Sequence, residues 1–272
     1  MAASTSSMRA VRYHGPGEPF HNDEIPVPQP GAGEALVRVG AAGICHTELH
    51  LRHGVLNLGV APLVPGHEIA GEVAAVGPGV DAVRPGDRVA VYYYVGCGRC
   101  SWCRQGQENL CRDVVDQFGF TADGGWAEYV VVPARNLVPL PDGLTVEEAA
   151  ALGCSATTAL HAVRSVADVR LGETVVVYGV GAVGYALIQL CRLAGARVIA
   201  VGRTPAKLAL AAELGADVTI NADELNPAVE TLRLTGDEGA DVVFELVGIT
   251  ETMERSVAML RRRGRLVFIG YS

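Results

Sequence analysis

Hydrophobic and polar residues follow two different patterns along the 272 residues of this chain. Up to about residue 144, short apolar or alternating runs are separated by turns rich in proline and glycine, which is typical of β-strands. A polar tail, residues 1–7, precedes them and is expected to be disordered. The clearest strands are expected at 35–39, 69–76, 88–94 and 128–132. The pattern therefore predicts a β-rich domain at 8–145, built as a partly open barrel.

From residue 145 onward, helical and strand patterns alternate, which predicts a doubly wound parallel sheet. Thr145 and Glu148 have the spacing of a capping box and open a helix that runs to about residue 166. The strand at 174–178 is apolar almost throughout, as expected for a strand covered on both faces. Further helices are expected at 182–194, 205–214, 226–233 and 251–260, and further strands at 197–201, 218–220, 241–246 and 265–269. These elements delimit the second domain, 146–272.

Composition and charge restrict the classes of function. The chain is 49% hydrophobic and 19% charged, which is ordinary for a globular protein of two domains. Its formal net charge of -8 argues against a nucleic-acid partner. The dense cationic run at 261–265 falls at an expected junction of helix and strand, where solvated charge near a helix end explains it. Because no apolar run has the length of a membrane span, we expect a soluble, cytoplasmic protein without a membrane partner.

Four cysteines lie within fifteen residues, in the order C-x2-C-x2-C-x7-C. Four thiolates can close a tetrahedral shell around one Zn²⁺ and leave no open position, so the site would be structural. The surrounding lobe, 95–113, is polar and glycine-rich, and metal binding would supply its folding energy. The alternatives are two disulfides or surface thiols without a role, and disulfides are disfavoured in a chain without a secretion signal. The expected zinc ligands are Cys97, Cys100, Cys103 and Cys111.

A G-x-G-x-x-G motif directly follows the strand at 174–178 and opens a helix. Such a motif alone is weak evidence, but the strand before it and the helix after it are the context of a dinucleotide site. The glycines allow a tight turn, a close approach of the pyrophosphate and close packing of the helix. Phosphate would then bind at the helix N-terminus. The residues concerned are Gly179, Gly181, Val183 and Gly184.

The end of the next strand bears on which dinucleotide binds. An acidic residue there would bind a free ribose 2′-hydroxyl, but the chain has Gly202, followed by Arg203 and Thr204. An arginine can pair with a 2′-phosphate; alternatively, it stacks on the adenine or lies in solvent. We therefore expect NADP(H) to be preferred over NAD(H).

The other chemically notable residues are spread over three segments, around Cys45, around His67 and around Cys154. Two thiolates and an imidazole would suit a zinc ion with one open position, but their spacing alone does not join them. Taken together, G-I-C-H-T-x-L-H at 43–50, G-H-E at 66–68 and G-D-R-V at 86–89 resemble the zinc-dependent alcohol dehydrogenases of the medium-chain dehydrogenase/reductase superfamily. The four-cysteine lobe, Cys154 and the glycine motif add to this resemblance, which extends from about residue 8 to 272. It implies a GroES-like first domain and a Rossmann second domain.

The resemblance also implies roles for single residues. Cys45, His67 and Cys154 would bind a catalytic zinc, so that the chain would hold two zinc ions. Thr47 would accept the proton of the alcohol, and His50 would pass it toward solvent through the cofactor ribose. Three further roles concern residues beside these. His46 would meet the pyrophosphate, and Glu68 would tune the basicity and exchange of the zinc ligands. Glu48 stands where many relatives have an Asp that orients the zinc-binding histidine.

The chain reaches only the fifth strand of the nucleotide domain, whereas members of the family it resembles continue with a sixth strand and a returning segment. We therefore expect a fragment of a longer protein, which would be a homo-oligomer at full length. The reaction expected is interconversion of alcohols and aldehydes or ketones by hydride transfer with NADP(H). The alternatives are an NAD-dependent dehydrogenase of a polyol or amino alcohol, and a truncated dinucleotide-binding protein without catalysis.

Overall fold

The computed structural model describes residues 6–56 and 58–271. The chain divides into two compact units, and the division falls between Cys154 and Ser155. Of the tail expected at residues 1–7, residues 1–5 lie outside the described residues, and Ser7 already belongs to the first strand. Within the described part of the chain, no helix combines the length and the apolar composition needed to cross a lipid bilayer.

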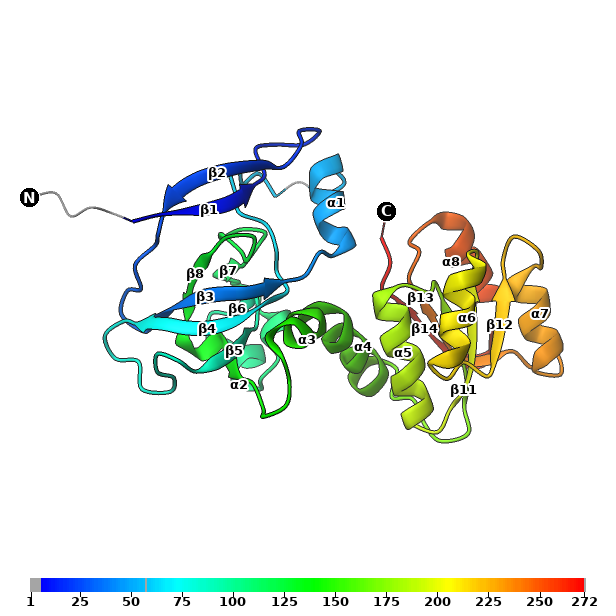
Figure 1. The fold of residues 1–272 in the computed structure, drawn as a ribbon. Coiled ribbons are helices and arrows are strands. Elements are labelled where there is room, and N and C mark those ends of the chain that lie inside the picture. Colours follow the sequence, from blue (N-terminus) through cyan, green and yellow to red (C-terminus); the bar gives the residue numbers. More distant parts are fainter. Residues whose placement is uncertain (1–5, 57, 272) are drawn as a thin grey trace, which may run out of the picture. The chain divides into compact units, whose positions relative to one another are not determined.

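Short antiparallel strands make up most of the first unit (Figure 1). They are β1 (Ser7–Arg12), β2 (His21–Pro26), β3 (Glu34–Ala42), β4 (Ile69–Val76), β5 (Arg88–Val91), β6 (Tyr94–Val95), β7 (Asp116–Gln117), β8 (Tyr129–Pro133) and β9 (Leu137–Pro139). Five of the described strands pair in the order β8-β3-β4-β5-β9, and irregular register between β3 and β4 bends this sheet. Val37, Val73, Val89 and Val132 are buried in one core on it. The predicted β-rich, GroES-like architecture is confirmed.

Short helices and one break in a strand complete this unit. The helical segments before residue 145 are α1 (His46–His53), α2 (Ser101–Arg104) and single 3₁₀ turns at Glu108–Leu110 and Ala134–Asn136. The single strand predicted at 88–94 is wrong, because the chain leaves the central sheet after Val91 and pairs with β7 from Tyr94. The buried Asn136 holds this crossing, since its amide donates to the carbonyl oxygens of Tyr92 and Tyr94, each at 2.7 Å.

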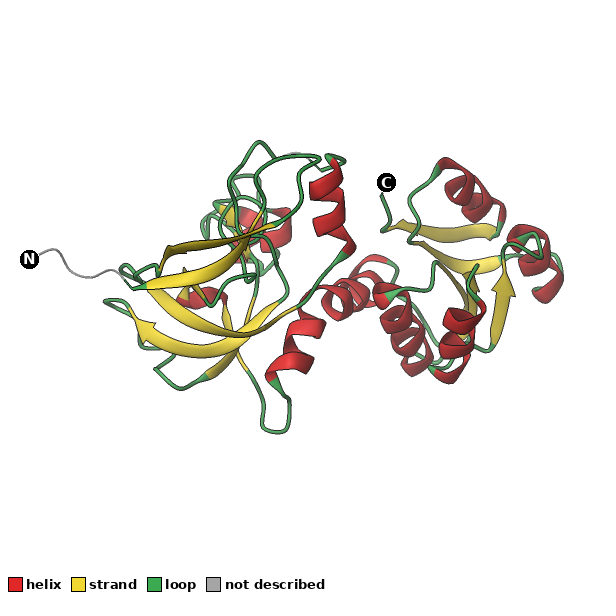
Figure 2. Ribbon diagram, turned by 45° about the horizontal axis from the view of Figure 1, so that its top comes forward, coloured by secondary structure: helices red, strands yellow, loops and turns green. Residues whose placement is uncertain are grey.

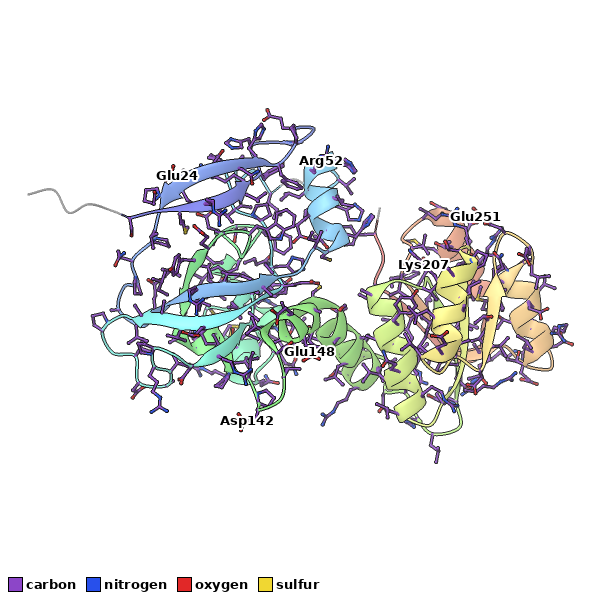
Figure 3. The ribbon with its side chains drawn as sticks, viewed as in Figure 1. Glu24, Arg52, Asp142, Glu148, Lys207 and Glu251 are labelled. Carbon is purple, nitrogen blue, oxygen red and sulfur yellow. The ribbon has the colours of Figure 1, made fainter. Side chains whose placement is uncertain are left out.

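A continuous helical run begins at Val146 and ends at Val166. The predicted capping box is present, because Thr145 Oγ1 accepts from the Glu148 N–H and the Glu148 carboxylate accepts from the Thr145 N–H. Glu148 is labelled in Figure 3. Two turns within the run have π-helical hydrogen bonding. The segments are α3 (Val146–Ala151), the π-helical turn Leu152–Ala156, α4 (Thr157–His161) and the π-helical turn Ala162–Val166.

The second unit is built on a parallel sheet in the order β12-β11-β10-β13-β14. Its strands are β10 (Thr174–Tyr178), β11 (Arg197–Gly202), β12 (Val218–Asn221), β13 (Ala240–Glu245) and β14 (Leu260–Phe268). Its helices are α5 (Ala182–Leu193), α6 (Pro205–Glu213), α7 (Pro227–Leu234) and α8 (Thr250–Ala258). Helices cover the sheet on both sides, as Figure 2 shows. The predicted Rossmann arrangement is confirmed.

Alternate residues of the central strand β10 enter two separate cores. Val175 and Val177 pack with Leu187 of α5 and Leu208 of α6, whereas Val176 on the opposite face packs with residues of α7 and with Met259. Both faces of the strand are therefore buried, which explains why its sequence is apolar almost throughout.

The arginine run lies within a strand and not at the predicted junction of helix and strand. α8 ends at Ala258, and β14 begins at Leu260, so that residues 261–263 belong to β14. Arg261 forms an ion pair of 2.5 Å with Asp241 on the neighbouring strand. Arg263 has a φ of 62°, and the register of the two strands shifts between Ala240 and Val242. β14 is therefore longer than its apolar residues indicate, because it already begins in the arginine run beside this bulge.

Candidate metal centres and dinucleotide site

The four cysteines of the lobe converge on one point. Their sulfur atoms all lie within 4.8 Å of one another. The Sγ–Sγ distances are 3.4 Å between Cys100 and Cys103, 3.9 Å between Cys100 and Cys111, and 4.0 Å between Cys97 and Cys103. Four sulfurs at about 2.3 Å from a zinc ion, at the corners of a tetrahedron, would be separated by about 3.8 Å. The donor set therefore fits one structural zinc, and these separations are too long for disulfides.

Backbone N–H groups point at the sulfurs and prepare them for a cation. Cys97 Sγ accepts from the N–H of Cys100 at 3.4 Å, and Cys111 Sγ accepts from the N–H of Cys97 at 3.3 Å. N–H groups of Arg99 and Cys100 lower the pKa of the Cys97 thiol to about 6. Such bonds stabilise thiolates, which are the form that binds metal.

Two side chains hold Gly96 of the lobe, Glu108 from within the lobe and Arg135 from the rest of the unit. The Glu108 carboxylate accepts from the Gly96 N–H at 3.2 Å, and the Arg135 guanidinium donates to the Gly96 carbonyl at 2.6 Å. Because the lobe has little apolar surface of its own, these contacts and the metal together would fix its conformation.

A second cluster joins residues that are far apart in the sequence. One ligand atom from each of Cys45, His67, Glu68 and Cys154 lies within 4.8 Å of the other three. Cys45 is the N-cap residue of α1, and His67 and Glu68 directly precede β4. Cys154 lies in the π-helical turn of the run that starts at Val146. A π-helical turn changes the direction of side chains relative to an α-helix, and such turns often occur at functional sites.

Glu48 bridges two members of this cluster. Its side chain is wholly buried. One carboxylate oxygen accepts from the Cys45 N–H at 2.8 Å, and the other lies 2.7 Å from His67 Nδ1. The first contact is part of a capping box of α1. The second fixes the histidine ring, and it leaves Nε2 as the nitrogen available to a metal.

The charges of the cluster are arranged for a cation. Hydrogen bonds from Cys154, and further ones from His67 and Thr47, lower the pKa of Cys45 to about 3 against the effect of burial. Burial lowers the pKa of His67, but its hydrogen bonds to Cys45 and Glu48 outweigh that effect and raise the pKa to about 9. These shifts favour a thiolate at Cys45 beside a positively charged His67. Two thiols and an imidazole at these distances are a donor set that fits a zinc ion, which would take the place of the proton.

Glu68 enters the cluster because Gly43 leaves room for it. A Cβ atom at Gly43 would lie 1.8 Å from Glu68 Oε2, so that no other residue type fits there without displacing the carboxylate. Burial, with a contribution from Cys45, raises the pKa of Glu68 to about 7. One of its carboxylate oxygens lies within 4.8 Å of the candidate ligand atoms of Cys45, His67 and Cys154.

Two aromatic rings flank the histidine of the cluster. The ring of Phe120 lies 4.8 Å from that of His67, and the ring of Tyr93 lies 5.1 Å from it. Tyr93 and Phe120 also contact each other, at 5.9 Å. Sequence reasoning did not identify this pair, because the two residues lie on different segments and neither belongs to a motif. They give the cluster an apolar wall.

The other predicted residues of the first unit share helix α1. Thr47 Oγ1 lies 3.4 Å from Cys45 Sγ. The rings of His46 and His50 pack edge to face, 4.8 Å apart. Burial, followed by the charge of His46, lowers the pKa of His50. The helix thus brings the Thr47 hydroxyl group to Cys45 and places His46 in its first turn and His50 one turn later.

The glycine motif lies between β10 and α5, as predicted. Gly181 is the N-cap residue of α5 and provides no side-chain cap, and a Cβ atom there would meet nothing within 4 Å. The N-terminus of the helix is therefore open to an anion. At Gly184 a Cβ atom would lie 2.2 Å from the Gly179 carbonyl oxygen, so this glycine permits the close packing of helix on strand. Val183 is half-buried and packs against the core of α5 and β10.

A cavity of about 510 Å³ opens beside this motif within the second unit. Gly179, Gly202, Arg203 and Thr204 line it, as do the apolar residues Val201 and Val247. Gly181, Val183 and Gly184 are in the first turn of α5 and are not among its lining residues. Its size, its apolar wall and its glycine turn fit the adenosine half of a dinucleotide.

Two further cations line this cavity, and sequence reasoning missed both. Lys207 comes from the first turn of α6, and Arg255 comes from α8. Lys207 and Glu251 are labelled in Figure 3, where they come from different helices of this unit. Arg255 forms an ion pair of 2.6 Å with Glu251. Lys207 could have been identified from the sequence, because it follows shortly after Arg203. Arg255 is distant in the sequence, and only the fold brings it to the cavity.

Comparisons with known proteins agree with this geometry. Residues 31–142 match the alcohol dehydrogenase GroES-like domain, and residues 182–272 match the zinc-binding dehydrogenase domain. An alcohol dehydrogenase of Geobacillus stearothermophilus is 37% identical over 93% of this chain and 74% of its own length. An NAD-dependent alcohol dehydrogenase of Sulfurisphaera tokodaii is 38% identical over 97% of this chain and 78% of its own length.

Solved structures extend the likeness to three dimensions. A candidate zinc-binding dehydrogenase from Sinorhizobium meliloti 1021, solved with NADP bound, superposes with a TM-score of 0.90 at 35% identity. The match covers 98% of this chain and 77% of that one. Both NAD and NADP thus occur among the relatives. The chain belongs to the zinc-binding alcohol dehydrogenases of the medium-chain dehydrogenase/reductase superfamily, and it is an oxidoreductase of alcohols and carbonyl compounds that uses a nicotinamide dinucleotide.

Proposed function

We propose that this protein is a zinc-dependent alcohol dehydrogenase that holds two zinc ions per chain and prefers NADP(H). Its substrates would be small or medium alcohols and the corresponding aldehydes or ketones. The observation that carries the proposal is the convergence of Cys45, His67 and Cys154, two thiols and an imidazole from three separate segments, on one point. Three such ligands leave one position open for a substrate oxygen.

The three proposed ligands, together with Glu48 and Glu68, account for the first step of the reaction, the loss of the alcohol proton. A zinc ion held there supplies Lewis acidity, which lowers the pKa of a hydroxyl group in contact with it. Glu48 orients His67 and holds the Cys45 backbone, so that both ligands keep one geometry. Glu68 lies close enough to serve as an exchangeable group while substrate enters and product leaves.

Thr47 and His50 would carry the proton. The Thr47 hydroxyl lies beside Cys45 Sγ at 3.4 Å and would accept the proton that the alcohol loses. His50 lies one turn further along α1, and burial with the charge of His46 lowers its pKa, which favours the neutral imidazole that can accept a proton. A dinucleotide bound in the cavity of the second unit would supply the hydride acceptor. Tyr93 and Phe120 would pack against the apolar part of the substrate.

The preference for NADP(H) is supported by two cations that line the cavity in the second unit, which Asp223 and Glu251 also line. Gly202 stands at the end of β11, where an acidic side chain would bind a free 2′-hydroxyl. The exposed Arg203 and Lys207 line the same cavity and could form charge-assisted bonds with a 2′-phosphate.

The proposed setting of the enzyme follows from the same features. All seven cysteines are free thiols, which favours a reducing compartment and supports a cytoplasmic location. The net charge of -8 gives no support for a nucleic-acid partner. β14 is an edge strand of its described sheet, and pairing through such an edge would support a homo-oligomer.

The test is a spectrophotometric assay with the zinc-loaded protein. The absorbance of the reduced nicotinamide is followed with NADPH and, in parallel, with NADH, against a panel of aldehydes and ketones. We expect faster consumption of NADPH, loss of activity with a zinc chelator, and two zinc ions per chain by metal analysis. A preference for NADH would overturn the cofactor assignment alone. Dinucleotide binding without turnover, in protein that holds two zinc ions, would overturn the enzymatic assignment.

A further inference from the structure

Glu245 is a wholly buried carboxylate that no part of the proposed chemistry uses. It is the last residue of β13, at the carboxyl end of the parallel sheet. A buried carboxylate is costly unless hydrogen bonds replace the water it has lost. Glu245 has such bonds, and all of them come from the chain that follows it.

The donors belong to the loop between β13 and α8. Glu245 Oε1 accepts from the N–H groups of Val247 at 2.9 Å and Gly248 at 3.0 Å, and from Thr252 Oγ1 at 2.7 Å. Glu245 Oε2 also accepts from the Gly248 N–H, at 3.1 Å. One side chain thus holds the loop and the first turn of α8 in a single conformation.

The N-cap residue of α8 is Ile249, which forms no side-chain cap. The Glu245 carboxylate lies near the positive end of the helix dipole. It holds the two N–H groups just before the helix, those of Val247 and Gly248, and the Thr252 hydroxyl of the first turn.

The loop that Glu245 holds is a wall of the dinucleotide cavity. Val247, Ile249 and Thr252 all line that cavity. On its other side the loop faces the glycine turn, since a Cβ atom at Gly179 would lie 3.1 Å from Leu246 Cβ and 3.4 Å from Val247 Cγ2. A change in the loop would alter both the width of the cavity and the space at the turn.

We infer that Glu245 is a positioning residue of the dinucleotide site: its buried carboxylate fixes the β13–α8 loop as one wall of the cavity and thereby sets the affinity for the cofactor. This inference rests on the proposed function, because it takes the cavity to bind NADP(H). Glu245 itself touches the cofactor at no point in this scheme and acts through Val247 and Gly248.

The test compares four forms of the zinc-loaded protein. Glu245→Gln keeps the shape but replaces one acceptor oxygen with an NH₂ group, which cannot accept from an N–H. Thr252→Val keeps the Glu245 carboxylate and removes the hydroxyl bonds to Glu245 and to the Ile249 carbonyl. Asp241→Asn is the matched control, because Asp241 lies on the same strand, accepts from the Thr174 N–H at 2.8 Å and pairs with Arg261, but is not a cavity residue. Each variant is titrated with NADPH, and its melting temperature is recorded.

We expect Glu245→Gln to raise the Kd for NADPH about tenfold. Thr252→Val should raise it by a smaller factor, and amide hydrogen exchange at 247–248 should become faster in Glu245→Gln. Asp241→Asn should lower the melting temperature and leave the Kd as in the wild type. An unchanged Kd in Glu245→Gln, with a lower melting temperature, would show a purely structural role and overturn the inference. If Glu245→Gln does not fold, an unchanged Kd in Thr252→Val overturns it. A wild-type protein that binds no dinucleotide would instead overturn the proposed function.

Discussion

Replacing Glu48 with glutamine tests whether its buried carboxylate fixes the geometry of Cys45 and His67. The Glu48 carboxylate accepts from the Cys45 N–H at 2.8 Å and lies 2.7 Å from His67 Nδ1, and its side chain is wholly buried. Glutamine has the same shape but only one acceptor oxygen. In Glu48→Gln, either the Cys45 N–H or the His67 Nδ1–H must therefore face an NH₂ group.

The size of the effect follows from these two contacts. Leaving one buried donor unsatisfied costs about 1–3 kcal/mol, and we expect the free energy of unfolding to fall by that amount. Losing the support of a ligating histidine typically weakens metal binding by about 10- to 100-fold. Both effects act on the cluster of Cys45, His67 and Cys154, whereas the four-cysteine lobe should keep its zinc.

Chelator competition and urea unfolding measure the two quantities. Glu148→Gln is the control, because Glu148 has the same capping-box position on α3 but lies at the surface. We expect Glu148→Gln to bind zinc as the wild type does. The reasoning fails if Glu48→Gln also keeps both zinc ions at wild-type chelator concentrations with an unchanged unfolding midpoint.

Three other changes separate the remaining parts of the proposal. Cys103→Ser should remove one zinc ion per chain and speed proteolysis within 97–111. Cys154→Ser should remove the other zinc ion, abolish turnover and leave NADPH binding intact. Metal analysis, limited digestion and titration with NADPH check these outcomes. Arg203→Ala should raise the KM for NADPH about tenfold and change that for NADH little, because it removes one charge-assisted bond to phosphate; equal changes for both cofactors would contradict this role. Gly184→Ala would place a Cβ atom 2.2 Å from the Gly179 carbonyl oxygen, so we expect a loss of about 1–3 kcal/mol in unfolding free energy and weaker NADPH binding, to be measured by denaturation and titration.

Local motifs were the part of the protein that the sequence determined by itself. The four cysteines of the lobe and the glycine motif each lie within a short segment, so that their spacing restricts their geometry directly. The two domain patterns were also readable, because the period of apolar residues differs between a half-exposed strand and a strand buried on both faces. The capping box at Thr145 and Glu148 is a further local signal that the structure reproduces.

The tertiary structure decided the features that join distant segments. Sequence spacing could not connect Cys45 with Cys154, and only the family resemblance suggested that they share a site. The structure brings them together with Glu68 and shows that the longer side chain of Glu48 reaches His67 while it caps α1. The division of one expected strand between β5 and β6 depends on Asn136, which lies far along the chain from that strand.

Sequence reasoning could not identify the roles of residues outside any motif, for the same physical reason. Glu245 reads as an ordinary acid at the end of a strand, and Arg255 as an ordinary surface cation of a helix. Their roles follow from burial and from the direction of the side chain, and both are set by how β13 and α8 pack in the sheet. A sequence fixes chemistry at each position and geometry over a few residues, whereas contacts between distant positions arise only when the packed core brings them together.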